Sequence, residues 1–127
     1  MKLKLSIFIA CAVLFVFWSG STVCYGQEEP IAGGYANADV ANTEVIAAAK
    51  FAVKKRSKSQ KAAIGLLSIK NARIQVVAGL NYELCLWVNF RKKNQKAVEQ
   101  FVKVVVYRNL KNAFSLTGWL EENCAEK

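Results

Sequence analysis

Three hydrophobic patterns follow one another along the chain. An uncharged apolar run comes first, over residues 7–18. After Asn42 the apolar residues recur every three or four positions, and from about Leu67 onward they alternate with polar residues. A spacing of three and four favours an amphipathic helix, whereas alternation favours half-buried strands. The pattern therefore predicts one helix followed by strands, with an apolar segment ahead of both.

The helical segment has a recognisable start and a basic end. Asn42 or Thr43 can cap the helix, and Glu44 follows in the first turn, where the helix dipole favours an acid. One apolar face is predicted to be buried, and it consists of Val45, Ala48, Ala49, Ala52 and Val53. Cations gather near the end of the helix: Lys54, Lys55, Arg56 and Lys58. We interpret them as a solvated helix end rather than a specific polyanion site.

The alternating part of the chain predicts four strands joined as consecutive hairpins. The alternation is clearest from Leu80 to Phe90, and Gly79 just before it can take the positive φ of a tight turn. The expected strands cover residues 67–77, 80–90, 98–107 and 113–119. Together with the helix, they predict a single two-layer α+β domain in which one helix packs on an antiparallel sheet of four to five strands.

Consecutive hairpins place their turns at alternating ends of a sheet. The turn at Gly79 and the polar turn of residues 108–112 should therefore share one edge. The basic tip of residues 91–96 should point the other way. Residues 27–41 are short of large apolar groups and predict an extended arm that can lie beside the first edge.

Residues 1–26 have the layout of a secretory signal peptide. Lys2 and Lys4 precede the apolar run, which is shorter than the roughly 20 residues that span a bilayer. Cleavage near Gln27 would leave residues 27–127 as an exported domain, secreted or periplasmic, with no stable membrane insertion. The short run disfavours an uncleaved anchor. The large Val23 beside Cys24 disfavours a lipoprotein acylated at that cysteine.

Composition narrows the possible chemistry. The chain has no His, and Asp39 is its only Asp. His-based triads, Cys-His proteases and His-ligated zinc sites are thereby excluded, so neither an enzyme nor a bound cofactor or metal is expected. Removal of residues 1–26 takes away two of the 18 basic residues and none of the 9 acids, which leaves a net charge of +7. Cys85 and Cys124 remain, and an even number in an exported chain predicts one disulfide.

Several motifs resemble the cystatin family, and in the order that the family has them. Gln75-Val76-Val77-Ala78-Gly79 matches the Gln-Xaa-Val-Xaa-Gly loop that marks cystatins. Ile31-Ala32-Gly33-Gly34 resembles their N-terminal glycine segment, and Ala49-Lys50-Phe51-Ala52-Val53 looks like the helix motif of plant cystatins. The chain is also similar to short exported bacterial domains of this type through Leu84-Cys85-Leu86 and Cys124. The resemblance extends from about Ile31 to Trp119.

The resemblance implies a strand ahead of the helix and reversible inhibition of papain-like cysteine proteases by a monomer. In cystatins the arm and two hairpin loops form a wedge that fills the substrate cleft. By position, Ile31, Ala32, Gly33 and Gly34 would occupy the non-primed subsites. Gln75, Val76, Val77, Ala78 and Gly79 would approach the catalytic centre. Asn109 and Leu110 would touch the primed side.

One departure and two alternatives accompany this interpretation. Asn109-Leu110 stands where most inhibitory cystatins have Pro-Trp, which predicts weaker inhibition, and Trp119 is expected after the last strand rather than in the turn. The first alternative is an exported cystatin-fold binding module without inhibitory activity. The second is a binder of polyanions or membrane surfaces, suggested by the net charge and the basic tip. Nucleic acid is not expected, because that tip has no interleaved aromatics.

Overall fold

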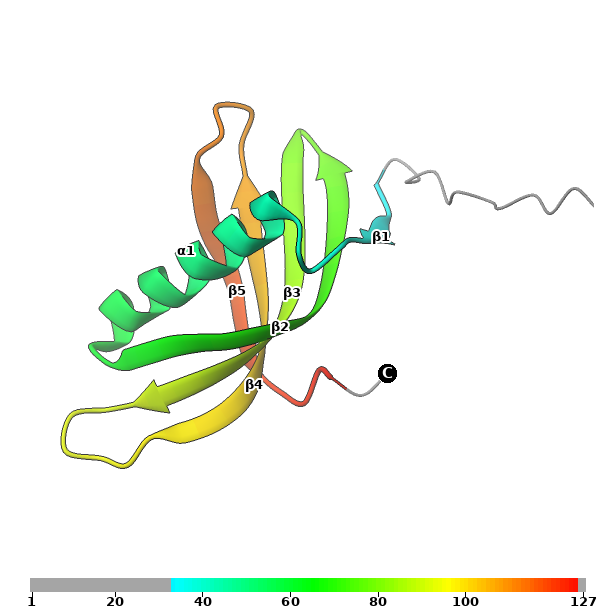
Figure 1. Ribbon diagram of the computed structural model, residues 1–127. Helices are drawn as coiled ribbons and strands as arrows, with labels where there is room; N and C mark the ends of the chain where they lie inside the picture. Colours follow the sequence, from blue (N-terminus) through cyan, green and yellow to red (C-terminus); the bar gives the residue numbers. More distant parts are fainter. Residues whose placement is uncertain (1–32, 126–127) are drawn as a thin grey trace, which may run out of the picture.

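The fold comes from a computed structural model in which residues 33–125 are described. One helix crosses a five-stranded sheet (Figure 1). The elements in chain order are β1 (Tyr35–Asn37), α1 (Thr43–Gln60), β2 (Ala63–Val77), β3 (Gly79–Arg91), β4 (Val98–Arg108) and β5 (Phe114–Glu121). The strands lie in the order β1-β2-β3-β4-β5, and every neighbouring pair is antiparallel. The predicted α+β fold is thus confirmed.

Helix α1 starts and ends on specific caps. Asn42 has an extended backbone, and its side-chain oxygen accepts a hydrogen bond of 2.8 Å from the backbone N–H of Glu44. At the other end Lys61 takes the left-handed conformation, with φ of 48°, and closes the last turn. Helices commonly end in this way, more often with Gly or Asn. The predicted apolar face of the helix is buried.

The core lies between α1 and the two central strands. Every second residue of β3 and β4 points at the helix, and these side chains are almost fully buried: Tyr82, Leu84, Leu86, Val88, Val102, Val104 and Val106. Opposite them the helix presents mainly alanines, so it can lie close to the sheet. Burying one large apolar side chain stabilises a fold by about 1.5–3 kcal/mol, and these residues therefore hold the two layers together.

All four expected strands are longer than their sequence pattern predicts, β2 most clearly. β2 begins at Ala63, before the expected start at Leu67, and has register shifts between Leu66 and Ser68 and between Ile69 and Asn71. Such bulges break the alternation, which explains the weak pattern there. β5 continues to Glu121, so the expectation that Trp119 follows the last strand is wrong. Pairing with β4 extends the strand, although Gly118 weakens its local propensity.

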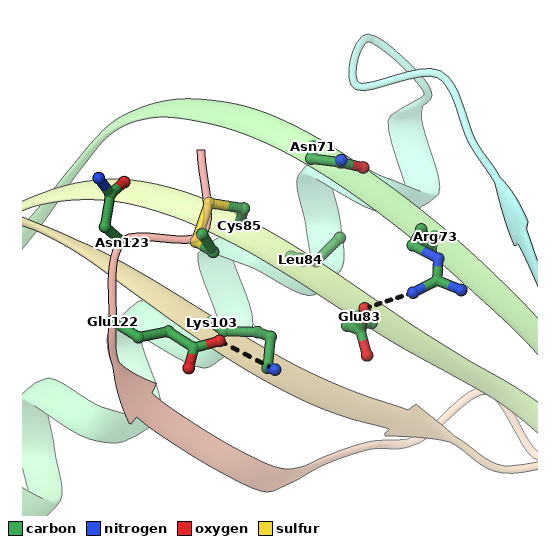
Figure 2. Close-up of a pocket in the computed structure, with 9 residues that line it drawn as sticks. Asn71, Arg73, Glu83, Leu84, Cys85, Lys103, Glu122 and Asn123 are labelled. Carbon is green, nitrogen blue, oxygen red and sulfur yellow. Dashed lines mark hydrogen bonds and ion pairs between the residues drawn. A yellow bond between two sulfur atoms is a disulfide. The ribbon is translucent and has the colours of Figure 1, made fainter. Parts of the chain in front are cut away.

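A disulfide joins Cys85 and Cys124, the pair that the cysteine count predicts. Cys85 alternates with Leu84 and Leu86, so it faces away from the helix and holds the segment after β5 against the outer face of the sheet. Figure 2 shows two ion pairs beside it, Arg73 to Glu83 at 3.1 Å and Lys103 to Glu122 at 2.9 Å. The hydrogen bond and charge of Glu122 raise the pKa of Lys103.

Within residues 33–125, the helix is not apolar enough to cross a membrane.

Candidate functional site

Three segments that are distant in sequence meet at one end of the sheet. The β2–β3 turn and the β4–β5 turn lie at the same end, and β1 lies beside β2 (Figure 1). Tyr35 pairs with Gln75, which places Gly33 and Gly34 next to the first turn. We call residues 33–34, 75–79 and 109–110 together the loop edge. Ile31, Ala32, Cys24 and the predicted signal peptide of residues 1–26 lie outside the described residues.

The β2–β3 turn requires glycine at its closing position. Gly79 has φ of 111°, which residues with a side chain rarely adopt. A Cβ at this position would lie 2.2 Å from the carbonyl oxygen of Arg108 and 3.0 Å from the ring of Tyr107. The turn therefore packs directly on the end of β4. The hydroxyl of Tyr107 also donates a hydrogen bond to the carbonyl of Ala78, which ties the turn to the neighbouring hairpin.

The first loop presents apolar side chains to solvent. Val76 is 46% exposed and Val77 is 41% exposed, and Ala78 at the tip is also exposed. The loop carries no charge. Exposed apolar groups at the tip of an ordered hairpin are typical of a contact surface.

Gln75 connects the arm to this loop. Its side-chain amide donates a hydrogen bond of 2.8 Å to the carbonyl of Gly33 and accepts one of 2.9 Å from the side-chain amide of Asn81. Asn81 lies directly opposite Gln75 in the β2–β3 ladder. Sequence reasoning assigned no role to Asn81, because only the strand register places it beside Gln75. The side-chain amides of Gln75 and Asn81 therefore orient the arm at Gly33 before any partner is bound.

The second loop is held by the side chain of its first residue. The side-chain oxygen of Asn109 accepts hydrogen bonds from the backbone N–H groups of Lys111, at 2.9 Å, and Ala113, at 3.0 Å. Asn112 then takes a left-handed conformation, with φ of 63°, which Asn tolerates. Leu110 is left 81% exposed at the tip. Asn109 thus orders the loop from within, while Leu110 is presented outward.

An ion pair joins the loop edge to the helix. The guanidinium of Arg108 pairs with the carboxylate of Glu44 in the first turn of α1 and lies 5.9 Å from the centre of the Tyr82 ring. The hydroxyl of Tyr82 donates to the same carboxylate at 3.3 Å. Burial raises the pKa of Tyr82, which favours the protonated hydroxyl that donates this hydrogen bond. These contacts fix the end of β4, from which the second loop leaves.

Phe114 supports the other side of the second loop. Its ring lies 5.5 Å from the ring of Phe51 on the helix and 6.3 Å from the ring of Tyr82, in an edge-on arrangement. Aromatic pairs in these geometries add about 0.5–1.5 kcal/mol beyond their burial. The root of the β4–β5 hairpin is therefore anchored in the core.

The loop edge is built for contact rather than for chemistry. Among the residues described at this edge, the tips offer backbone groups, amides and small apolar side chains. Arg73 and Arg108 stand behind the tips and are engaged with acidic partners, and the exposed Lys111 follows Leu110 in the second turn. Such a surface can bind in a concave site and exclude water from it, with little polar surface to desolvate.

Comparisons of the sequence with known proteins place this chain in a family of protease inhibitors. Residues 37–121 match the family model SQAPI, described as an aspartic acid proteinase inhibitor. The chain is also 32% identical over 96 residues to L-cystatin from Tachypleus tridentatus, an alignment that covers 72% of this chain and 72% of that protein.

Solved structures with similar folds include two proteins of low sequence identity. The salivary cystatin of the soft tick Ornithodoros moubata superposes with a TM-score of 0.60 at 20% identity, over 73% of this chain and all of the tick protein. Al-CPI superposes with a TM-score of 0.57 at 20% identity, over 71% of this chain and all of that chain. At this identity the likeness concerns the fold.

Proposed function

The chain belongs to the cystatin-like family of protease inhibitors, and from this premise we propose that it is a reversible, tight-binding inhibitor of papain-like cysteine endopeptidases. In this proposal the loop edge enters the active-site cleft. Residues 31–34 fill the non-primed subsites, the loop from Gln75 to Gly79 covers the catalytic cysteine, and Asn109 with Leu110 contacts the primed side. The observation that carries the proposal is the meeting of these three segments at one pre-ordered edge.

The order of the loop edge supports tight binding. Gln75 holds the arm, Tyr107 holds the first turn, and Asn109 holds the second. Because these segments are fixed in the free protein, association costs little additional loop entropy. Protease–inhibitor interfaces bury about 1,600 Å² in total, and a wedge of three segments is suited to supply that area.

The proposal includes where and in what form the protein acts. We propose that the chain is exported through residues 1–26 and acts as a monomer outside the cytosol. The disulfide supports an oxidising compartment, because such bonds are rare in the cytosol. A membrane anchor and a nucleic-acid partner are not part of this function.

The deciding experiment is a titration of papain with the protein purified from an exporting host. We expect loss of hydrolysis of a peptide substrate, reversed by dilution, at inhibitor concentrations in the micromolar range or below. No inhibition at tens of micromolar would overturn the proposal. It would favour the alternative of a cystatin-fold binding module without inhibitory activity.

Three variants assign the inhibition to the loop edge. Gly79→Glu should abolish inhibition, because the side chain meets Arg108 and a charge enters the wedge. Val77→Asp adds a charge at a solvent-exposed position and should weaken inhibition at least tenfold without affecting the fold. Lys92→Ala, at the opposite end of the sheet, is the matched control and should inhibit like the wild type. Equal loss in all three would contradict the assignment.

The family match favours a second target class, the aspartic proteinases. The matching model carries that description, and its range begins at Asn37, after the glycine segment of the arm. Titration of pepsin at its acidic working pH tests this candidate. Inhibition of pepsin but not papain would replace the first proposal, and inhibition of papain alone would remove the second.

A further inference from the structure

A second surface forms at the end of the sheet opposite the loop edge. The last turn of α1 and the β3–β4 hairpin lie side by side there (Figure 1), because Ala63, just after the helix, pairs with Arg91 at the end of β3. Lys61, Arg91, Lys92 and Lys93 line one shared hollow. Two basic clusters that are about 30 residues apart in sequence thus become one.

The helix extends this cluster into a line. Lys50, Lys54 and Lys58 are spaced four residues apart, so they lie on one face of α1. All three line a groove between α1 and β2, whose floor includes Ile64 and Leu66. At 1.5 Å per residue the helix carries the line over roughly 16 Å from Lys50 to Lys61. We call Lys50, Lys54, Lys58, Lys61, Arg91, Lys92 and Lys93 the basic track.

The basic track has no acidic residues to balance it. All of its side chains are exposed, and within residues 33–125 none of them takes part in an ion pair. The sequence contains no Asp or Glu between Glu44 and Glu83, nor between Glu83 and Glu99. Glu99 is the acid nearest in sequence to the hairpin tip, and it lies opposite Asn89 in the β3–β4 ladder. Like charges gathered on one surface repel one another, and a bound polyanion relieves that repulsion.

The shape of the track distinguishes among polyanions. Lys50, Lys54 and Lys58 follow one another along a groove between a helix and a strand, an arrangement that suits an extended, linear polyanion. Single-stranded nucleic acid needs exposed aromatic rings on which bases stack. Phe90, near the tip, is half-buried, with the ammonium group of Lys92 5.9 Å from its ring centre.

We propose that the basic track binds a linear sulfated polysaccharide. Sulfate groups along the chain pair with successive ammonium groups of the groove, and Arg91 to Lys93 hold its continuation at the hairpin tip. The hairpin part of the track lies at the end of the sheet opposite the loop edge, so a ligand held there leaves the loop edge free. This proposal does not depend on protease inhibition, and a separate binding measurement tests it.

The test uses heparin as the probe and two charge-matched double variants. Lys61→Asn with Lys92→Gln removes two charges from the track, and Asn is chosen because it tolerates the left-handed conformation at position 61. Lys70→Gln with Lys111→Gln removes two exposed cations elsewhere. We expect the wild type to be retained on immobilised heparin at physiological ionic strength. The track variant should bind about tenfold more weakly, with a shallower salt dependence, and the control pair within about twofold of wild type.

Three results would overturn the proposal. One is release of the wild type from heparin at physiological ionic strength. Another is an equal loss in the two double variants, which would mean that net charge alone causes retention. The third is tighter binding to duplex DNA or to phosphatidylserine vesicles than to heparin at the same ionic strength, which would assign the track to another polyanion. Circular dichroism of each variant verifies that the fold is retained.

Discussion

At the scale of single residues, the loop edge contains two kinds of side chain. Some hold the loops in place by hydrogen bonds, and others are exposed and available for contact with a partner. Gln75 and Asn109 have polar side chains that bond within the edge, to the arm and to the second loop respectively. Val77 and Leu110 face solvent. Contact energy with a partner should therefore come from the apolar side chains, and pre-organisation from the amides.

Leu110 gives a prediction at this scale. Trp is a typical interface anchor, and its additional area over Leu is worth on the order of 1–2 kcal/mol of binding. Leu110→Trp should therefore lower the inhibition constant for papain by about 5- to 30-fold, and Leu110→Ala should raise it. Leu110 is 81% exposed, so neither change should alter the midpoint of thermal unfolding appreciably.

The control for this prediction is Leu120→Ala. Leu120 is 51% exposed on β5, near the other end of the strand from the second loop. Its truncation should leave the inhibition constant unchanged. If Leu110→Trp also left it unchanged, the second loop would not contact the protease.

At the scale of elements, helix α1 connects the two ends of the molecule. Its first turn binds the end of β4 through Glu44 and Arg108 and so supports the loop edge. Its last turns supply Lys54, Lys58 and Lys61 to the basic track. The helix dipole favours this distribution, with the acid at the start and the cations at the end.

The contact between α1 and β3 predicts an alkaline loss of stability. Burial raises the pKa of Tyr82 above its ordinary value of 10.0, so the folded state holds this proton more tightly than the unfolded state. The resulting stabilisation is complete below about pH 10 and falls as pH rises toward the higher folded pKa, by up to about 1.4 kcal/mol per pH unit. Denaturant unfolding followed from pH 8 to pH 11 measures it.

Tyr82→Phe isolates this contribution. Near pH 8 the variant should be less stable by roughly 0.5–1.5 kcal/mol, because it loses the hydrogen bond to Glu44. Its disadvantage should shrink above about pH 10, where only the wild type loses the Tyr82 stabilisation. Parallel curves for the two proteins across this range would contradict the assignment to Tyr82.

At the scale of the whole molecule, the simple strand order separates the two proposed surfaces. Consecutive hairpins send the β2–β3 and β4–β5 turns to one end and the β3–β4 turn to the other. The disulfide lies on the outer face, away from the helix and from both sets of turns. Stability and binding should therefore be separable by mutation.

Removal of the disulfide tests that separation. The bond closes a segment with a sequence separation of 39, for which the chain-entropy relation gives about 3–4 kcal/mol. Cys85→Ser with Cys124→Ser should lower the free energy of unfolding by up to that amount, as measured by urea denaturation. The inhibition constant should stay the same under conditions where the variant remains folded.

A mass increase of two hydrogens on reduction of the wild type tests the bond itself. If the double Ser variant lost inhibition while its circular dichroism spectrum stayed unchanged, the bond would have a role in the loop edge that this arrangement does not predict.

The sequence predicts those features that local physics determines. Val45, Ala48 and Ala52 form a helical face because each is placed by the period of a single helix. The start of β2 and the extension of β5 to Glu121 escape the pattern, because bulges and pairing with β4 decide them. Asn81 escapes it as well, because only strand register brings its amide to Gln75.

By itself, the sequence determined the fold class, the predicted turn at Gly79 and the absence of histidine chemistry, because each depends on residue type and local spacing. Only the tertiary structure decided what lies together: Gln75 with Gly33, Arg108 with Glu44, and the helix end with the β3–β4 tip. These contacts join residues far apart along the chain. Two basic clusters that are separate in the sequence, the helix end and the β3–β4 tip, therefore form one surface after strands β2 and β3 pair.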